Sequence, residues 1–218
     1  MILAAFALSA TGQKERFVKP VDEAKKDASF FAFRTKLITA VEKKDSKYIL
    51  SIVDRDITLG FGGDDGIANF KKLWKIEQKD SEFWKEFAVV IKNGGSFIGE
   101  GRNKLSSFAA PYLFTAWPED LDVFEHQAIF GTNVNLREEP NTESKVVSQL
   151  SYNIVKIDYD NSKQDGEDND SPSWFKVETL GGKKGWVKAD FARSSIDYRA
   201  GFEKKRGVWK MTFFVAGD

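Results

Sequence analysis

A small β-barrel is indicated by the segment Gly131-Thr-Asn-Val-Asn-Leu-Arg-Glu-Glu-Pro140, followed along the chain by Trp174-Phe-Lys-Val177 and Gly185-Trp-Val187. From 128 to 192 the apolar residues occur in short alternating runs, and the spacing of an amphipathic helix is absent. Turn residues separate these runs. Short strands and turns at this density predict a small all-β barrel.

These residues resemble a bacterial SH3 (SH3b) domain, and they occur in the order of that family. The family pattern is a first strand of the type V-N-V-R-x-x-P, then a valine and a leucine in the second strand, then W-x-x-V and G-W-V. The resemblance covers 128–193, and several motifs in one order make a specific match. Ser151-Tyr152-Asn153 departs from the pattern, because a glycine and an acidic residue usually follow the leucine, and this leaves the hairpin geometry open. Phe191 replaces the closing tyrosine, which removes one hydroxyl from the aromatic set.

A further hairpin is expected after the barrel, with strands over 197–202 and 208–215. Its apolar face carries Trp209, Met211, Phe213 and Val215. A two-stranded hairpin is marginal alone and needs a sheet and helices to cover such a face. The barrel has already used its own strands, so we expect the hairpin to return to the first half of the chain.

The first half shows helical patterns before strands. Between 22 and 44 the apolar residues recur three and four positions apart, as on one stripe of a helix. The stripe consists of Phe30, Phe33, Leu37, Ile38 and Val41. Further elements are expected as helices over 46–53, 65–74 and 81–91, strands over 57–61, 96–98 and 111–115, and a glycine-rich turn at 62–66.

These patterns predict an α+β fold: a helix-rich α+β domain with a C-terminal β-hairpin, interrupted by a small all-β SH3-like barrel. The predicted boundaries are 13–127 together with 194–218 for the α+β domain and 128–193 for the barrel. The leading helices, the strand and the G-x-W-K-M-T-F hairpin are similar to the nuclear transport factor 2-like, cystatin-like cone. The helices over 65–74 and 81–91 depart from the usual plan of that cone.

The first residues indicate export. Residues 1–10 are apolar or small, and charged residues begin at Lys14. As a helix this segment would span only about 15 Å, half of a bilayer core, so it predicts no stable membrane span. We interpret 1–12 as a signal peptide and expect a periplasmic or secreted protein. A buried strand or helix end is the alternative, and the missing basic segment leaves open that the natural start lies upstream of Met1.

Composition excludes several classes of protein. The chain has 33 Lys and Arg against 33 Asp and Glu, no cysteine, and His126 as its single histidine. The zero net charge argues against nucleic acid as a partner. Without cysteine there are no disulfides, thiol nucleophiles, thiolate zinc sites or iron–sulfur clusters. The cysteine peptidases and zinc amidases that accompany SH3b domains are therefore not encoded, and we expect no catalytic residues, no metal and no cofactor.

One acidic segment and one glycine-rich segment each have more than one interpretation. The loop 158–171 holds six carboxylates, which suits either a solvated insertion or a Ca²⁺ site that lacks the EF-hand order. The segment 62–66 suits a tight turn, because no Lys-Ser or Lys-Thr follows it as in a phosphate-binding loop. A hydrolase that uses two carboxylates a few ångströms apart also stays open.

The SH3b resemblance implies binding of peptidoglycan or an envelope peptide in a groove lined with aromatic residues. The candidate ligand-binding residues are Trp174, Tyr152, Tyr159, Trp186 and Arg137. Arg137 could pair with a carboxylate, although it could also brace its own barrel, and Trp186 could lie in the core. An alternative function is a small-molecule pocket between helix and sheet of the α+β domain, with the barrel as a targeting module.

Overall fold

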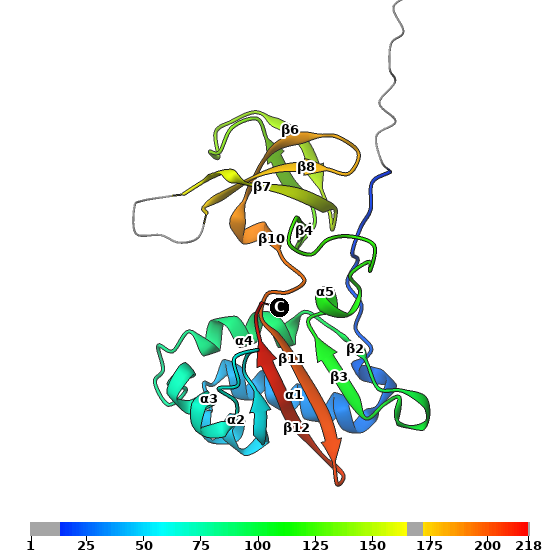
Figure 1. Cartoon of the computed structure of the whole chain (residues 1–218), viewed down its shortest axis with the longest axis vertical. Helices are drawn as coiled ribbons and strands as arrows, with labels where there is room; N and C mark the ends of the chain where they lie inside the picture. The colour runs from blue at the N-terminus through cyan, green and yellow to red at the C-terminus, as the bar shows by residue number, and fades with distance from the viewer. Residues whose placement is uncertain (1–13, 165–171, 218) are drawn as a thin grey trace, which may run out of the picture. The chain divides into compact units, whose positions relative to one another are not determined.

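The structure is a computed structural model that describes residues 14–164 and 172–217 (Figure 1). The signal peptide predicted at 1–12 and half of the acidic loop, residues 165–171, lie outside the described residues. The chain divides into two compact units, one containing 19–123 and 194–217 and the other containing 14–18 and 124–193. We describe each unit by itself.

The first unit contains helices and one sheet. Its elements are η1 (Ala24–Lys26), α1 (Ala28–Glu42), α2 (Ser46–Ile52), β1 (Val53–Thr58), α3 (Ile67–Trp74), α4 (Phe83–Lys92), β2 (Ser96–Phe97), η2 (Gly101–Asn103), β3 (Ser107–Ala110), α5 (Tyr112–Thr115), β11 (Arg199–Lys205) and β12 (Val208–Val215). The side chain of Asp27 caps α1 by accepting from the Phe30 N–H at 2.7 Å, and Asp45 caps α2 in the same way.

The sheet of this unit has the strand order β1-β12-β11-β3-β2. β1 runs parallel to β12, and the other neighbours are antiparallel. The C-terminal hairpin β11–β12 therefore lies in the middle of the sheet, between β1 and β3 (Figure 1). This pairing confirms that the hairpin returns to the first half of the chain.

The space between the helices and the sheet is filled by aromatic rings. The ring of Phe30 in α1 lies 4.2 Å from that of Phe108 in β3 and 4.8 Å from that of Trp209 in β12. Phe87 in α4 lies 5.2 Å from Phe214 in β12, again between ring centroids. Because these side chains occupy the interior, the hollows found in the described part of this unit lie at its surface rather than between helix and sheet.

Two strands predicted from the sequence differ from the structure. The strand expected over 111–115 is wrong, because the strand ends at Ala110 and Tyr112–Thr115 forms α5. Pro111 has no N–H for a sheet ladder, and the Phe114 N–H donates to its carbonyl at 3.1 Å, which starts a helical turn. The strand expected over 57–61 is β1, which ends at Thr58 because the Asp65 carboxylate accepts the Leu59 N–H at 2.9 Å.

The described part of the second unit consists of strands and one short turn of helix. Its elements are β4 (His126–Ile129), β5 (Val134–Arg137), β6 (Val146–Leu150), β7 (Ile154–Lys163), β8 (Trp174–Thr179), β9 (Lys184–Lys188), η3 (Ala189–Phe191) and β10 (Ala192–Arg193). The strand order is β10-β4-β7-β8-β9-β5-β6, with antiparallel neighbours throughout. Its core consists of Ile129, Val134, Leu136, Leu150, Val155, Ile157, Phe175, Val177 and Val187. The α+β fold class with an interrupting small barrel is confirmed.

Residues 14–18 and 124–127 group with the barrel, whereas the sequence placed them in the α+β domain. The Arg16 carbonyl accepts from the Ile154 N–H at 2.9 Å. The Glu15 carboxylate accepts from the hydroxyl of Thr179 at 2.7 Å and from the amide of Asn153 at 3.2 Å. These partners lie far along the chain, so no local pattern could reveal them.

Among the described residues, no helix has the length and apolarity needed to cross a bilayer.

Candidate functional site

Side chains on the outer face of the barrel sheet gather around β8, β9 and β5. Trp174 and Lys176 alternate with Phe175 and Val177, which belong to the core, so the first two side chains face outward. Trp174 pairs with Lys188, and Trp186 pairs with both Lys176 and Arg137. Since cross-strand partners share a face, the register places Arg137, Trp174 and Trp186 on one side of the sheet.

A groove of about 220 Å³ lies on the barrel surface and contains two of the predicted site residues, Trp174 and Arg137. Its lining consists of Thr132, Asn133, Val134, Asn135, Arg137, Thr142, Trp174, Lys188 and Phe191. Trp174 is only 8% exposed, whereas Phe191 is 44% exposed. The groove therefore offers one largely covered aromatic ring and one accessible ring.

Two cations face this groove. Arg137 donates from Nη1 to the Ser144 carbonyl at 2.6 Å, which is the bracing role considered from the sequence, and it also lines the groove. Among the described residues, Ser144 is the one hydrogen-bond partner of the Arg137 side chain. Lys188 pairs with Asp190 at 2.8 Å, and this hydrogen bond raises the pKa of Lys188 above its usual value. The raised pKa keeps Lys188 positively charged at neutral pH.

Residues 132–192 match the family described as Bacterial SH3 domain. The chain contains a bacterial SH3 domain. The SH3b prediction is thus confirmed, and the groove just described lies within the bacterial SH3 domain. The similarity of the flanking residues to the nuclear transport factor 2-like cone stays a prediction. No curated protein is similar to the chain at a significant level.

Tyr152 lies in the turn between β6 and β7, outside the lining of the groove. Its φ is +59°, in the left-handed region, at the place where the family pattern has a glycine or acidic residue. The Tyr152 N–H donates to the Gly131 carbonyl at 3.0 Å, and the Ser151 N–H donates to Asn153 Oδ1 at 2.8 Å. The hairpin that the sequence left open is therefore a turn held by these two bonds, with a tyrosine in a conformation that suits glycine.

This conformation gives a prediction for stability. We expect the bacterial SH3 domain to be more stable with Tyr152→Gly than with Tyr152→Ala, by about 1 kcal/mol, because only alanine has a Cβ that opposes a left-handed φ. At an ordinary exposed position the order is reversed. Urea denaturation of the two variants measures the difference, and an alanine variant that is the more stable of the two would contradict the left-handed turn.

Trp186 and Tyr159 do not line the groove. Trp186 is half-buried on the outer face and is not among the core residues. Tyr159 is 47% exposed, and its hydroxyl accepts from Gln127 Nε2 at 3.1 Å. The structure thus brings Trp174 and Arg137 together in the groove and places Tyr152, Tyr159 and Trp186 elsewhere on the bacterial SH3 domain.

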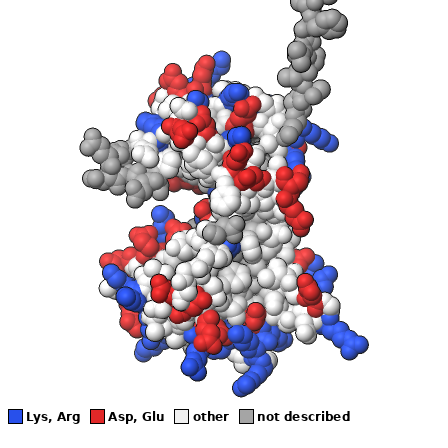
Figure 2. Space-filling view, in the orientation of Figure 1, with Lys and Arg blue, Asp and Glu red and all other residues white. Residues whose placement is uncertain are grey.

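Tyr159 borders a second hollow of about 550 Å³ on the bacterial SH3 domain, where charged side chains pair with one another. The ion pairs are Lys156–Glu125 at 2.8 Å, Lys176–Asp158 at 3.6 Å and Lys184–Glu178 at 3.2 Å. On the face shown in Figure 2, acidic and basic side chains lie interspersed over this unit. Such mutual pairing leaves little net charge to attract a ligand.

The described part of the acidic loop begins with Asp158. Hydrogen bonds from Asn161 lower the pKa of Asp158, so this carboxylate is already engaged within the chain. The described residues contain no group of three or more metal-ligating side chains. Asp160 is described and exposed, whereas the remaining four carboxylates of the loop fall in 165–171, outside the described residues, so the calcium interpretation stays untested.

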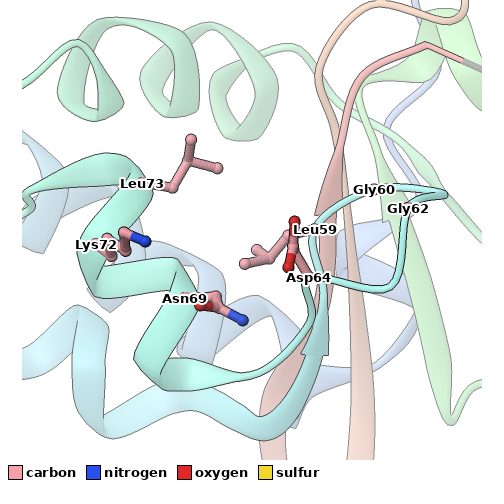
Figure 3. Close-up of a pocket in the computed structure, with 7 residues that line it drawn as sticks. All are labelled: Leu59, Gly60, Gly62, Asp64, Asn69, Lys72 and Leu73. Carbon is pink, nitrogen blue, oxygen red and sulfur yellow. The ribbon is translucent and has the colours of Figure 1, made fainter.

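The glycine-rich segment 62–66 forms a bend before α3 and borders a hollow of about 550 Å³ (Figure 3). The Gly66 N–H donates to the Ile57 carbonyl at 2.8 Å, which ties the bend to β1. Figure 3 shows Asn69, Lys72 and Leu73 reaching from α3 towards the loop that carries Asp64. One acid and one base are present in this lining, so the hollow has no surplus of positive charge for a phosphate group.

Hydrolase chemistry receives no support from the carboxyl groups with shifted pKa. A general acid at neutral pH needs a raised pKa. Glu23, Asp27, Asp54 and Asp158 have clearly shifted pKa values, and each of the four is lowered. His126 starts β4 and pairs in register with Lys156.

Sequence reasoning missed most of the groove lining, including Asn133, Lys188 and Phe191. Phe191 carried a usable signal, because it stands at the aromatic position that closes the family pattern. Asn133 had none, since its φ of +56° and its bond from N–H to the Ser151 hydroxyl at 2.9 Å depend on the tertiary fold. Lys188 could have been placed from the alternation of β9, which puts it on the same face as Trp186.

Proposed function

We propose that the bacterial SH3 domain is a non-catalytic binding module of the cell envelope, with peptidoglycan or an envelope peptide in the groove of Trp174, Arg137, Lys188 and Phe191. The observation that carries this proposal is the groove itself, which combines aromatic surface with two cations inside a domain of this family. Bacterial SH3 domains are associated with cell-wall binding at the level of the family. The apolar start at 1–12 supports export to the periplasm or beyond.

The lining suits a ligand with carboxylates and an apolar or ring-shaped part. Arg137 can bind a carboxylate through charge-assisted hydrogen bonds, and Lys188 can do so where its ammonium group is shared between the ligand and Asp190. Phe191 offers a ring on which a sugar face or an aliphatic side chain packs, and Asn133 and Asn135 bear amides that accept or donate hydrogen bonds. Cell-wall stem peptides carry free carboxylates beside sugar rings, so peptidoglycan presents both features together.

We also propose that the two units are separate domains, with the α+β domain interrupted by the bacterial SH3 domain. The α+β domain would then keep its own sheet while the SH3 domain carries the binding activity. Sedimentation with purified, insoluble peptidoglycan tests the activity of the full chain. Failure to pellet at low salt would count against the proposal.

A pair of phenylalanine variants tests the groove. Phe191→Ala should weaken co-sedimentation with peptidoglycan by roughly fivefold, the value of one aromatic contact of about 1 kcal/mol. Phe191 is 44% exposed, so its truncation should leave the fold intact. Phe124→Ala is the matched control, because Phe124 is 60% exposed on the same unit but borders the other hollow. Equal losses in both variants would place the binding surface outside the groove.

A further inference from the structure

The last strand of the barrel sheet, β6, has one neighbouring strand among the described residues. It pairs with β5 and stands at the end of the order β10-β4-β7-β8-β9-β5-β6. The outer edge of a terminal strand presents backbone N–H and C=O groups that no neighbour in the sheet satisfies. β6 therefore has the backbone arrangement that accepts an additional strand.

The side chains of this strand lack the usual protection of an edge. Val146 and Val147 are 40% and 46% exposed. The run from Val146 to Asn153 contains no charged residue and no proline. Natural edge strands are commonly protected by charges, prolines or bulges, and here a register irregularity at Leu136 and Arg137 affects only the Val146 end. Ser148 to Leu150 pairs regularly with β5 and leaves its outer edge open.

The charge beside this edge discriminates between possible occupants. Lys183 is exposed and donates from Nζ to the Ser148 hydroxyl at 3.1 Å, at the middle of β6. A second copy of the chain paired antiparallel about Ser148 would bring two Lys183 ammonium groups to the same place. Like charges in such a position oppose pairing, whereas a carboxylate on an incoming strand would be attracted. Just before the strand, Lys145 lies opposite Glu138, whose N–H donates to the Lys145 carbonyl at 3.0 Å, so the attraction for a carboxylate rests on Lys183.

We infer that the edge of β6 binds an extended, acidic peptide by adding it to the sheet as an eighth strand, with Lys183 pairing a carboxylate of the peptide. The main chain of β6 supplies the hydrogen bonds, Val146 and Val147 supply apolar contacts, and Lys183 supplies the preference for acidic sequences. This inference rests on the proposed function, because it takes the envelope-peptide class of ligand and assigns it a docking edge distinct from the groove.

Blocked pentapeptides test the preference for acidic sequences on the full chain. The probe acetyl-Val-Glu-Val-Glu-Val-amide should bind, and the matching peptide with lysines in place of the glutamates should bind at least about fivefold more weakly. Lys183→Glu should reverse this order. Lys184→Glu is the matched control, because it makes the same charge change at a residue paired with Glu178 rather than with β6. Equal affinities of both peptides for the wild type would overturn the inference.

Methylated peptides test the backbone contacts. Strand addition uses alternate N–H groups of the peptide on one edge. Of two acidic probes N-methylated at odd or at even positions, one should lose binding and the other should retain it. Retention by both probes would show that binding does not use strand pairing and would overturn the inference. The inference would also be overturned if the wild-type chain formed a dimer that Val147→Lys dissociates, because the edge of β6 would then bind a second copy of the chain.

The outcome separates this inference from the proposed function. Suppose that the chain pellets with peptidoglycan, that Phe191→Ala weakens pelleting, and that the acidic probe does not bind. The groove function is then supported and the β6 docking edge is refuted. Suppose instead that the chain binds the acidic probe, that Lys183→Glu reverses the preference between the acidic and basic probes, and that the chain does not pellet. The β6 docking edge is then supported and the peptidoglycan assignment is refuted.

Discussion

Truncating Phe30 to alanine should lower the free energy of unfolding of the α+β unit by about 3 to 5 kcal/mol. Phe30 is fully buried at the centre of the core, where its ring contacts other aromatic rings from α1 and from four strands of the sheet. These neighbours are Phe33, Phe97, Phe108, Phe202 and Trp209. Alanine would remove the ring from all of them and leave a cavity that large, rigid neighbours fill poorly.

Phe31→Ala provides the control for this prediction. Phe31 is the next residue of the same helix and is 44% exposed, so its truncation removes the same atoms with little loss of packing. We expect the Phe31 variant to lie within about 1 kcal/mol of the wild type in urea denaturation. Similar losses for both variants would contradict the assignment of Phe30 to the centre of the core.

The same variant tests whether the two units fold separately. If they are independent domains, Phe30→Ala should shift only the unfolding transition of the α+β unit, and binding of peptidoglycan should persist where that unit is already unfolded. A single transition that carries the SH3 domain with it would show that the two units unfold cooperatively. The number of unfolding transitions therefore bears on the domain proposal without depending on the identity of the ligand.

Local patterns predicted much of the fold. The alternation of Val134 and Leu136 with polar residues predicted a barrel strand, and the structure buries both side chains. The three-to-four spacing around Phe30 and Leu37 predicted α1. The hairpin position followed from a physical need, because an amphipathic hairpin at the end of the chain required a sheet to join. Each of these predictions uses a repeat that a few neighbouring residues carry.

Features set by distant parts of the chain could not be predicted in this way. Glu15 groups with the barrel because Thr179 and Asn153 donate to its carboxylate. The interior of the α+β unit is filled rather than hollow because rings from α1, α4 and the sheet meet there, which depends on how those elements pack. Spacing along the sequence carries neither kind of information.

The candidate site shows the same limit. The period-two alternation of a strand gives the face of a side chain but not its depth. Trp174 and Trp186 share the outer face, yet Trp174 is 8% exposed in the groove whereas Trp186 is half-buried outside it. Arg137 was predicted with two alternative roles, and the structure shows that bracing and lining the groove coexist. Exposure had to come from the tertiary structure in each case.

Gly95→Ala, which adds a single methyl group, should lower the free energy of unfolding of the α+β unit by about 3 to 5 kcal/mol. Backbone strain and overpacking both contribute to this loss. Gly95 has a φ of +143°, and its N–H donates to the Val21 carbonyl at 2.9 Å. A Cβ at this position would lie 2.1 Å from the Ala109 carbonyl oxygen and 2.7 Å from Cε1 of Phe108. The oxygen belongs to the main chain of β3 and the ring is fully buried, so neither can move away cheaply.

Two other glycines separate the causes of this loss. Gly207→Ala meets a φ of +83° but no atom within 4 Å, so it should cost about 1 kcal/mol through backbone conformation alone. Gly62→Ala meets neither obstacle and should change the free energy of unfolding by less than about 0.5 kcal/mol. Thermal or urea denaturation should therefore rank the variants Gly62, Gly207 and Gly95 in order of increasing loss. If the Gly95 variant is no less stable than the Gly207 variant, β3 does not approach Gly95 closely. The steric part of the loss exists only if Ala109 and Phe108 lie where the structure places them.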